Sequence, residues 1–120
     1  MNLNLLVIRT ENPEKLKKQY ELLGFKFEYH KHGNGPLHYA SENDGFVFEI
    51  YPLTKAMNIA NGSIRLGFEF DNLESILLKI ENTTWKILSK IEETKWGRTA
   101  IIQDLDGRKI ELKAKTTQLP

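Results

Sequence analysis

The feature that most constrains the fold is an internal repeat. Residues 44–50 and residues 106–112 share one pattern at an offset of 62: Asp-Gly, two further residues, an apolar residue, Glu and an apolar residue. Residues 6–8 before Asn12 and residues 66–68 before Asn72 match at an offset of 60. Because these matches keep the same order along both halves, they predict a chain built from two copies of one module.

Each half has the pattern of a strand, a helix and three further strands. In the first half, Asn12 and Pro13 are typical of a helix start, and Gly24 of its end. Asn72 is the corresponding helix start in the second half. The predicted strands are residues 3–9, 25–31, 37–41 and 46–51, then 64–70, 85–88, 98–103 and 109–113. We therefore predict one domain over residues 1–120, with module 1 at about 3–52, a linker at about 53–62 and module 2 at about 63–114.

Alternation along the strands predicts which side chains share a face of each sheet. In residues 46–51, Phe46, Phe48 and Ile50 would pack under the helix, which leaves Glu49 and Tyr51 on the opposite face. In the last strand, the apolar residues at 110 and 112 would pack under the second helix, and the residues at 109, 111 and 113 would face away. Each module is thus expected to carry polar groups on the sheet face that no helix covers.

Four segments resemble the vicinal oxygen chelate superfamily, the glyoxalase/bleomycin resistance/dioxygenase proteins. They are residues 20–25, 48–52, 96–100 and 104–112, and the resemblance extends over about residues 3–113. It implies an α+β fold in which two tandem βαβββ modules form a cupped, incomplete mixed barrel with the site inside. Many members are dimers, so the resemblance also implies a homodimer, with modules that pair within the chain or across the dimer.

The metal enzymes of this superfamily take ligands from the first and last strands of each module. The last-strand positions correspond to Glu49 and Glu111, which are suitable ligands. The first-strand positions correspond to Leu5, which has no donor atom, and Arg65, which is cationic. Two carboxylates alone are a poor site for zinc, nickel or iron. We therefore expect no metal or other cofactor, although a divalent metal stays an alternative.

Arg65 has two interpretations. The one we favour is a salt-bridge network with Glu49 and Glu111 that closes the floor of the cup. The other is an anchor for an anionic or carbonyl-bearing ligand, because a guanidinium binds planar acceptors in a bidentate manner.

The three histidines are further candidates. His38 would share a face with Ala40, where it could reach a ligand or act as a base. The interpretation we favour is nevertheless a partly exposed surface histidine. His30 and His32 are expected to be solvated residues of a turn.

Aromatic residues could line a pocket, namely Phe27, Tyr39, Tyr51, Trp85 and Trp96, although about half of them are expected in the core. Trp96 could stack on a flat ligand at the rim, and its neighbour Arg98 could bind ligand or hold a turn or a dimer contact. No catalytic residue is assigned. The predicted ligand-binding residues are His38, Glu49, Tyr51, Arg65, Trp96, Arg98 and Glu111.

Composition narrows the function classes. A net charge of +1 gives no general attraction to nucleic acid or membranes, and the chain has no cysteine. The start of the sequence lacks the pattern of a signal peptide, so we expect a cytoplasmic protein. Two functions stay open. One is metal-free binding, or sequestration, of a small molecule at the module or dimer interface. The other is a divergent glyoxalase-type lyase or isomerase, or a dioxygenase-like enzyme, using Glu49, Glu111, His38 or a metal.

Overall fold

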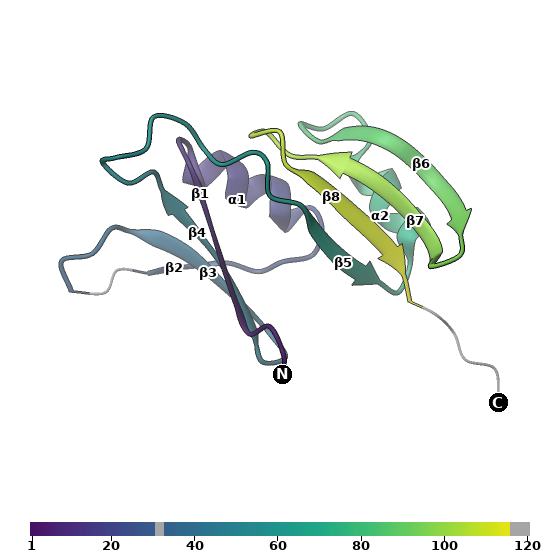
Figure 1. Cartoon of the computed structure of the whole chain (residues 1–120), viewed down its shortest axis with the longest axis horizontal. Coiled ribbons are helices and arrows are strands. Elements are labelled where there is room, and N and C mark those ends of the chain that lie inside the picture. The colour runs from purple at the N-terminus through teal and green to yellow at the C-terminus, as the bar shows by residue number, and fades with distance from the viewer. Residues whose placement is uncertain (31–32, 116–120) are drawn as a thin grey trace. The chain divides into compact units, whose positions relative to one another are not determined.

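The chain folds into two compact units, Met1–Asn61 and Gly62–Pro120. The computed structural model describes residues 1–30 and 33–115. Within each unit the elements follow the order β, α, β, β, β (Figure 1). We call these units module 1 and module 2. The predicted α+β fold of two βαβββ modules is confirmed.

Module 1 is a four-stranded mixed sheet with one helix. The strands lie in the order β1-β4-β3-β2, with β1 parallel to β4 and the other pairs antiparallel. The tight turn between β3 and β4 has positive φ angles at both Asp44 (47°) and Gly45 (85°), which is the geometry of a two-residue hairpin. The elements are β1 (Leu5–Thr10), α1 (Pro13–Glu21), β2 (Glu28–His30), β3 (His38–Asn43) and β4 (Phe46–Pro52).

The core of module 1 lies between α1 and one face of this sheet. The Asn12 side-chain oxygen accepts a hydrogen bond from the Lys15 backbone N–H at 3.1 Å, which caps the start of α1 as predicted. From α1, Tyr20 packs edge-on against Phe48 of β4, with ring centroids 5.0 Å apart. Both residues are fully buried. The predicted assignment of Phe48 and Ile50 to the helix-covered face is therefore correct.

Module 2 repeats this topology, with strand order β5-β8-β7-β6 and β5 parallel to β8. The Asn72 side-chain oxygen caps α2 by accepting from the Ser75 backbone N–H at 3.0 Å. The buried side chains of β8 are Ile110 and Leu112, as the alternation predicts. The elements are β5 (Leu66–Phe70), α2 (Leu73–Ile80), β6 (Lys86–Thr94), β7 (Gly97–Gln103) and β8 (Lys109–Ala114).

The strand β2 is shorter than its prediction and β6 is longer. The predicted strand 25–31 is reduced to Glu28–His30, because Phe25 and Phe27 join the aromatic cluster around Phe48, at centroid distances of 5.2 and 5.8 Å. The strand β6 continues to Thr94, well past the predicted 85–88, and its pairing with β7 contains two register shifts. The part of β6 beyond residue 88 is rich in Lys and Glu and mostly exposed. It therefore lacks the alternation of apolar residues that predicts a strand. No helix among residues 1–30 and 33–115 is long and apolar enough to cross a membrane.

Candidate functional site

The candidate site lies on the face of the module 1 sheet that α1 does not cover, which we call the open face of module 1. Strand register identifies its residues, because side chains of directly paired residues point to the same side. Ala40 of β3 pairs with Glu49 of β4, and Val7 of β1 also pairs with Glu49. Two residues along, the register aligns His30, His38, Tyr51 and Arg9 in a row across all four strands.

Flat side chains in this row stack on one another. The His38 and Tyr51 rings are nearly parallel, 7° apart in orientation with centroids at 4.1 Å. His30 stacks on the other side of His38 at 6.0 Å. The Arg9 guanidinium lies 4.9 Å from the Tyr51 ring centroid, a cation–π distance, and donates a hydrogen bond to the Pro52 carbonyl at 3.0 Å. The row is therefore a fixed stack that leaves little freedom to Tyr51.

His38 is the buried centre of the site, with 1% of its surface exposed. Our interpretation of His38 as a partly exposed surface residue is therefore wrong, because Tyr51 and His30 cover both of its faces. Its Nδ1 lies 3.2 Å from the Pro36 carbonyl oxygen, which can only accept, so Nδ1 carries a proton. Its Nε2 faces Glu49 Oε2 at 3.3 Å and the Tyr51 hydroxyl at 3.4 Å.

Glu49 and Tyr51 complete the cluster, in the positions that strand alternation predicted. The neutral imidazole accepts a hydrogen bond from the Tyr51 hydroxyl at Nε2, whereas the imidazolium donates Nε2–H to the Glu49 carboxylate. Burial raises the pKa of the Tyr51 phenol above its ordinary value, the negative Glu49 raises it further, and Arg9 opposes the shift. Tyr51 thus stays a neutral hydrogen-bonding group at neutral pH.

Glu111 lies on the equivalent open face of module 2 in different surroundings. Its strand neighbours there are Gly67 of β5 and Ile101 of β7. The position that corresponds to His38 is Thr99, which lies beside Lys113. Within residues 62–115, Glu111 forms no ion pair or hydrogen bond through its side chain. The two predicted carboxylates are therefore not equivalent in chemistry.

Arg65 is an exposed residue one position before β5 begins. Among the residues that the structure describes in module 2, it forms no ion pair with Glu111, so that half of the favoured salt-bridge network is wrong. Within module 1, Glu49 Oε2 lies 3.3 Å from His38 Nε2. A role for Arg65 in ligand binding stays a prediction.

Arg98 and Trp96 lie at the turn between β6 and β7. Arg98 forms ion pairs with Glu74 of α2 and with Glu93 of β6, the latter at 3.3 Å, so its guanidinium holds three elements together. Hydrogen bonding to Arg98 lowers the pKa of Glu74 and raises that of Arg98. Trp96 is 69% exposed and has the Lys95 ammonium over its ring. A structural role thus accounts for Arg98, and contact of Trp96 with a ligand stays a prediction.

The remaining aromatic and histidine candidates lie in different surroundings from one another. Trp85 is buried in the core of module 2, and Phe27 belongs to the aromatic cluster of module 1. Tyr39 lies on the helix-covered face, where the Lys17 ammonium is 5.0 Å from its ring centroid. His30 is half-buried in β2 with Glu28 at 3.2 Å, so its prediction as a solvated turn residue is wrong. The prediction for His32 lies outside the described residues.

Sequence reasoning missed Arg9 and the stacked row itself. Arg9 was within a predicted strand, but its neighbours depend on the parallel pairing of β1 with β4, which residue spacing does not give. Alternation along β1 does place Val7 and Arg9 on one face, so the parallel register was the missing information.

Surface hollows within each module lie on the helix side. One of about 510 Å³ lies beside the start of α1 and includes Tyr29, Leu37 and Tyr39. Another of about 470 Å³ lies between α2 and β6 and includes Leu77 and Ile91. Neither includes Glu49 or Tyr51.

The residues at the predicted ligand positions do not fit the metal site found in metal enzymes of the superfamily that the sequence resembles. Leu5 begins β1 without a donor atom, and Arg65 would repel a cation at the matching position of module 2. Glu49 Oε2 is engaged by His38. Among the described residues, no three His, Cys, Asp or Glu side chains converge as a metal site would require. No chemical step is therefore derived through a metal.

A family model now identifies the chain. The model described as the Glyoxalase/Bleomycin resistance protein/Dioxygenase superfamily matches residues 2–112. The chain belongs to this superfamily. No curated protein matches it. The superfamily resemblance inferred from residues 20–25, 48–52, 96–100 and 104–112 is confirmed.

Solved structures share the fold at low sequence identity. An integron cassette protein from the mobile metagenome of V. cholerae is 23% identical, with 97% of this chain and 96% of that chain covered and a TM-score of 0.72. TnmS3, an antibiotic-binding protein from Streptomyces sp. CB03234, is 21% identical, with 97% of each chain covered and a TM-score of 0.75. These likenesses establish the fold of this superfamily member.

Proposed function

We propose that this superfamily member is a metal-free small-molecule-binding protein whose ligand contacts the open face of module 1. The observation that carries the proposal is the buried His38, whose Nε2 lies 3.3 Å from Glu49 Oε2 and 3.4 Å from the Tyr51 hydroxyl. Burial of a polar ring beside a carboxylate costs free energy unless hydrogen bonds of good geometry compensate for the lost hydration. A pre-arranged polar cluster beside exposed apolar side chains, here Leu5 and Val7, is typical of binding sites.

Two further observations support binding over metal catalysis. The resemblance assigns Leu5 and Arg65 to two of the ligand positions of the metal enzymes, and neither side chain can donate to a metal. TnmS3, which shares the fold, is described as antibiotic-binding, so the fold is compatible with binding of a small molecule.

Metal content is the first test. The purified chain, prepared without chelator, is assayed by mass spectrometry, and its melting temperature is followed with nickel, zinc, manganese and iron(II). We expect substoichiometric metal and no melting shift that depends on Glu49. A stoichiometric metal whose binding is lost in Glu49→Gln would contradict the metal-free proposal.

A ligand screen is the second test. Aromatic, anionic and cationic small molecules are screened by thermal shift, and each hit is repeated on His38→Gln and Tyr51→Leu. The matched controls are Thr99→Ala and Lys113→Leu, at the equivalent positions of module 2. We expect hits to weaken only in the module 1 variants. Hits that all four variants bind equally well would place the ligand elsewhere, and Arg65→Ala then tests the remaining predicted anchor.

The His38–Glu49 pair also favours one alternative, an enzyme that moves a proton. A carboxylate beside an imidazole is a common acid–base arrangement, in which one group takes a proton from a carbon next to a carbonyl and returns it. This would be a lyase or isomerase reaction of the glyoxalase type without the metal. Incubation of a screened hit in D₂O distinguishes the two functions, because only an enzyme exchanges that C–H proton at a rate that Glu49→Gln abolishes.

A further inference from the structure

We infer that the open face of module 1 binds a cationic amphiphile, a small molecule with an ammonium group next to an apolar part. This inference rests on the proposed function and specifies the class of ligand. It follows from three properties of the face: which ring surfaces are already covered, which polar atoms are left, and how charge and apolar side chains are distributed around them.

The Tyr51 and His38 rings of the face are not available for stacking. Tyr51 lies between His38 on β3 and Arg9 on β1, and these strands flank β4 on opposite sides. Both faces of the Tyr51 ring are therefore covered. His38 is covered by Tyr51 and His30 and is almost fully buried. A ligand meets the edges of this stack, so hydrogen bonding and charge decide what binds.

The polar group presented to a ligand is the carboxylate of Glu49. Its Oε2 lies 3.3 Å from His38 Nε2, and Oε1 forms no hydrogen bond or ion pair with any described residue of module 1, that is residues 1–30 and 33–61. The side chain is 15% exposed, so it is reachable but mostly desolvated. An ionised carboxylate only accepts hydrogen bonds, and its complement is therefore a donor, best a charged one.

The charge around Glu49 favours a cation over an anion. Register places Glu28 and Glu42 on the same face, at β2 and β3. The opposing charge is Arg9, whose guanidinium already engages the Pro52 carbonyl and the Tyr51 ring. His30, next to Glu28, partly offsets the acidic charge only when it is protonated. A cationic ligand gains from this arrangement, whereas an anion meets three carboxylates.

Apolar side chains lie immediately beside the carboxylate. Val7 pairs directly across from Glu49, and Leu5 pairs with Val47 two residues along the same strands. Val7 and Leu5 are 38% and 48% exposed. Because adjacent strands are about 5 Å apart and same-face residues along a strand about 7 Å apart, an ammonium at Glu49 brings attached carbon groups onto Val7, Leu5 and Val47. The face thus matches a cation with an apolar substituent.

The test uses three probes of the same size: benzylamine, benzyl alcohol and benzoate. Binding to the isotope-labelled full chain is followed by NMR amide shifts, at neutral pH and low salt. We expect benzylamine to bind most tightly and to shift the amides of Val7, Glu49 and Tyr51. In Glu49→Gln its affinity is expected to fall about tenfold, the loss of one charge-assisted hydrogen bond. The matched control is Glu69→Gln, an exposed carboxylate on the open face of module 2, which should bind as the wild type does.

A second variant guards against misfolding of Glu49→Gln. Val7→Lys places a cation on a partly exposed position beside Glu49, and it should weaken benzylamine while strengthening benzoate. No saturable binding of benzylamine, equal binding of all three probes, or loss of binding in Glu69→Gln alone would each overturn the inference. In those cases the proposed function still stands if other hits depend on His38 and Tyr51, and it fails separately if none does.

Discussion

The two modules share a backbone plan but differ in the chemistry of equivalent positions. Glu49 and Glu111 occupy the same place in β4 and β8, yet among the described residues of its own module only Glu49 has an imidazole beside it. In module 1 the row next to this carboxylate is aromatic and stacked, and in module 2 it is charged and polar. The equivalent residues of that row are His38, Tyr51 and Arg9 in module 1 and Thr99, Lys113 and Glu69 in module 2.

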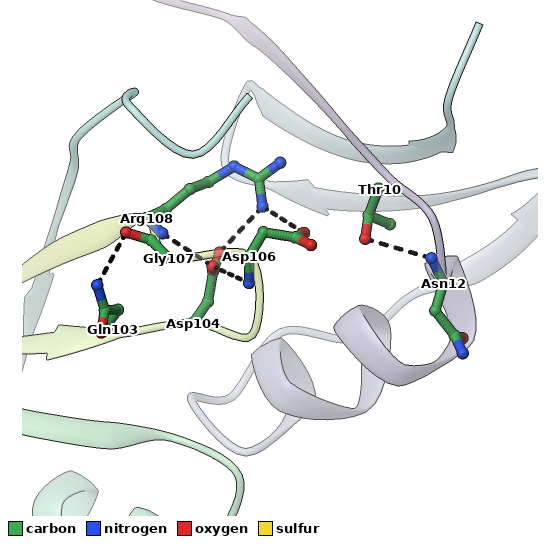
Figure 2. A network of polar contacts seen from close by, with 7 residues as sticks. All are labelled: Thr10, Asn12, Gln103, Asp104, Asp106, Gly107 and Arg108. Carbon is green, nitrogen blue, oxygen red and sulfur yellow. Dashed lines mark hydrogen bonds and ion pairs between the residues drawn. The ribbon is translucent and has the colours of Figure 1, made fainter. Parts of the chain in front are cut away.

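The turn before the last strand also differs between the modules, and here the polar cluster is in module 2. In module 2 the Arg108 guanidinium is buried and ion-paired with Asp104 at 3.1 Å and Asp106 at 2.8 Å, as Figure 2 shows. The Asp104 carboxylate also accepts hydrogen bonds from the backbone N–H groups of Asp106 and Arg108. The residue of module 1 at the position of Arg108 is the half-buried Phe46. The two modules thus share one backbone plan and differ in their side chains. Module 1 has its polar cluster on the open face, and module 2 has its cluster in the turn at residues 104–108, which we call the closing turn.

The largest expected effect tests the closing turn. Arg108→Ala should lower the free energy of unfolding by about 3–5 kcal/mol, because two largely buried carboxylates lose their cation. Phe46→Ala, the matched change in module 1, removes half-buried apolar surface and should cost only about 1–2 kcal/mol. Urea unfolding followed by circular dichroism measures both. Equal losses would mean that the two turns contribute alike; if Arg108→Ala does not fold, Arg108→Lys, which keeps the charge, should be less destabilised than Asp104→Ala.

An intermediate effect tests what the modules share. Asn12 and Asn72 cap α1 and α2 with the same side-chain oxygen to backbone N–H contact. Asn12→Ala and Asn72→Ala should each cost about 1 kcal/mol of unfolding free energy, whereas Asn→Asp at either position should be nearly neutral. A cost in one module only would break the equivalence of the two helix starts. Thermal and urea unfolding of the four variants measures it.

The smallest effect concerns pH. Because hydrogen bonding to Arg98 lowers the folded-state pKa of Glu74, this pair adds stability above the unfolded-state pKa of a glutamate, and the contribution is lost as pH falls through the folded value. The melting temperature of Glu74→Gln should therefore approach that of the wild type in acid. Added salt should shrink the difference, since the pair is exposed. In module 1, Glu14→Gln removes a looser pair with Lys18 at 3.8 Å and should change less; a larger change there would reverse the comparison.

The sequence by itself determined the repeat, the fold and the facing of the strands. The Asp-Gly turns, the two Asn caps and the period-two alternation around Phe48 and Ile110 are local signals, since they depend on residues a few positions apart. They sufficed to place Glu49 and Tyr51 on the open face.

Only the tertiary structure decided which polar groups meet. His38 was interpreted as a surface residue because alternation gives its face but not its neighbours across strands. The parallel register of β1 with β4 brings Arg9 to Tyr51, and the antiparallel register of β3 brings His38 to Tyr51 and Glu49. Such pairings join residues more than ten positions apart in the sequence, and a side chain acquires its charge partners, its burial and its function from them.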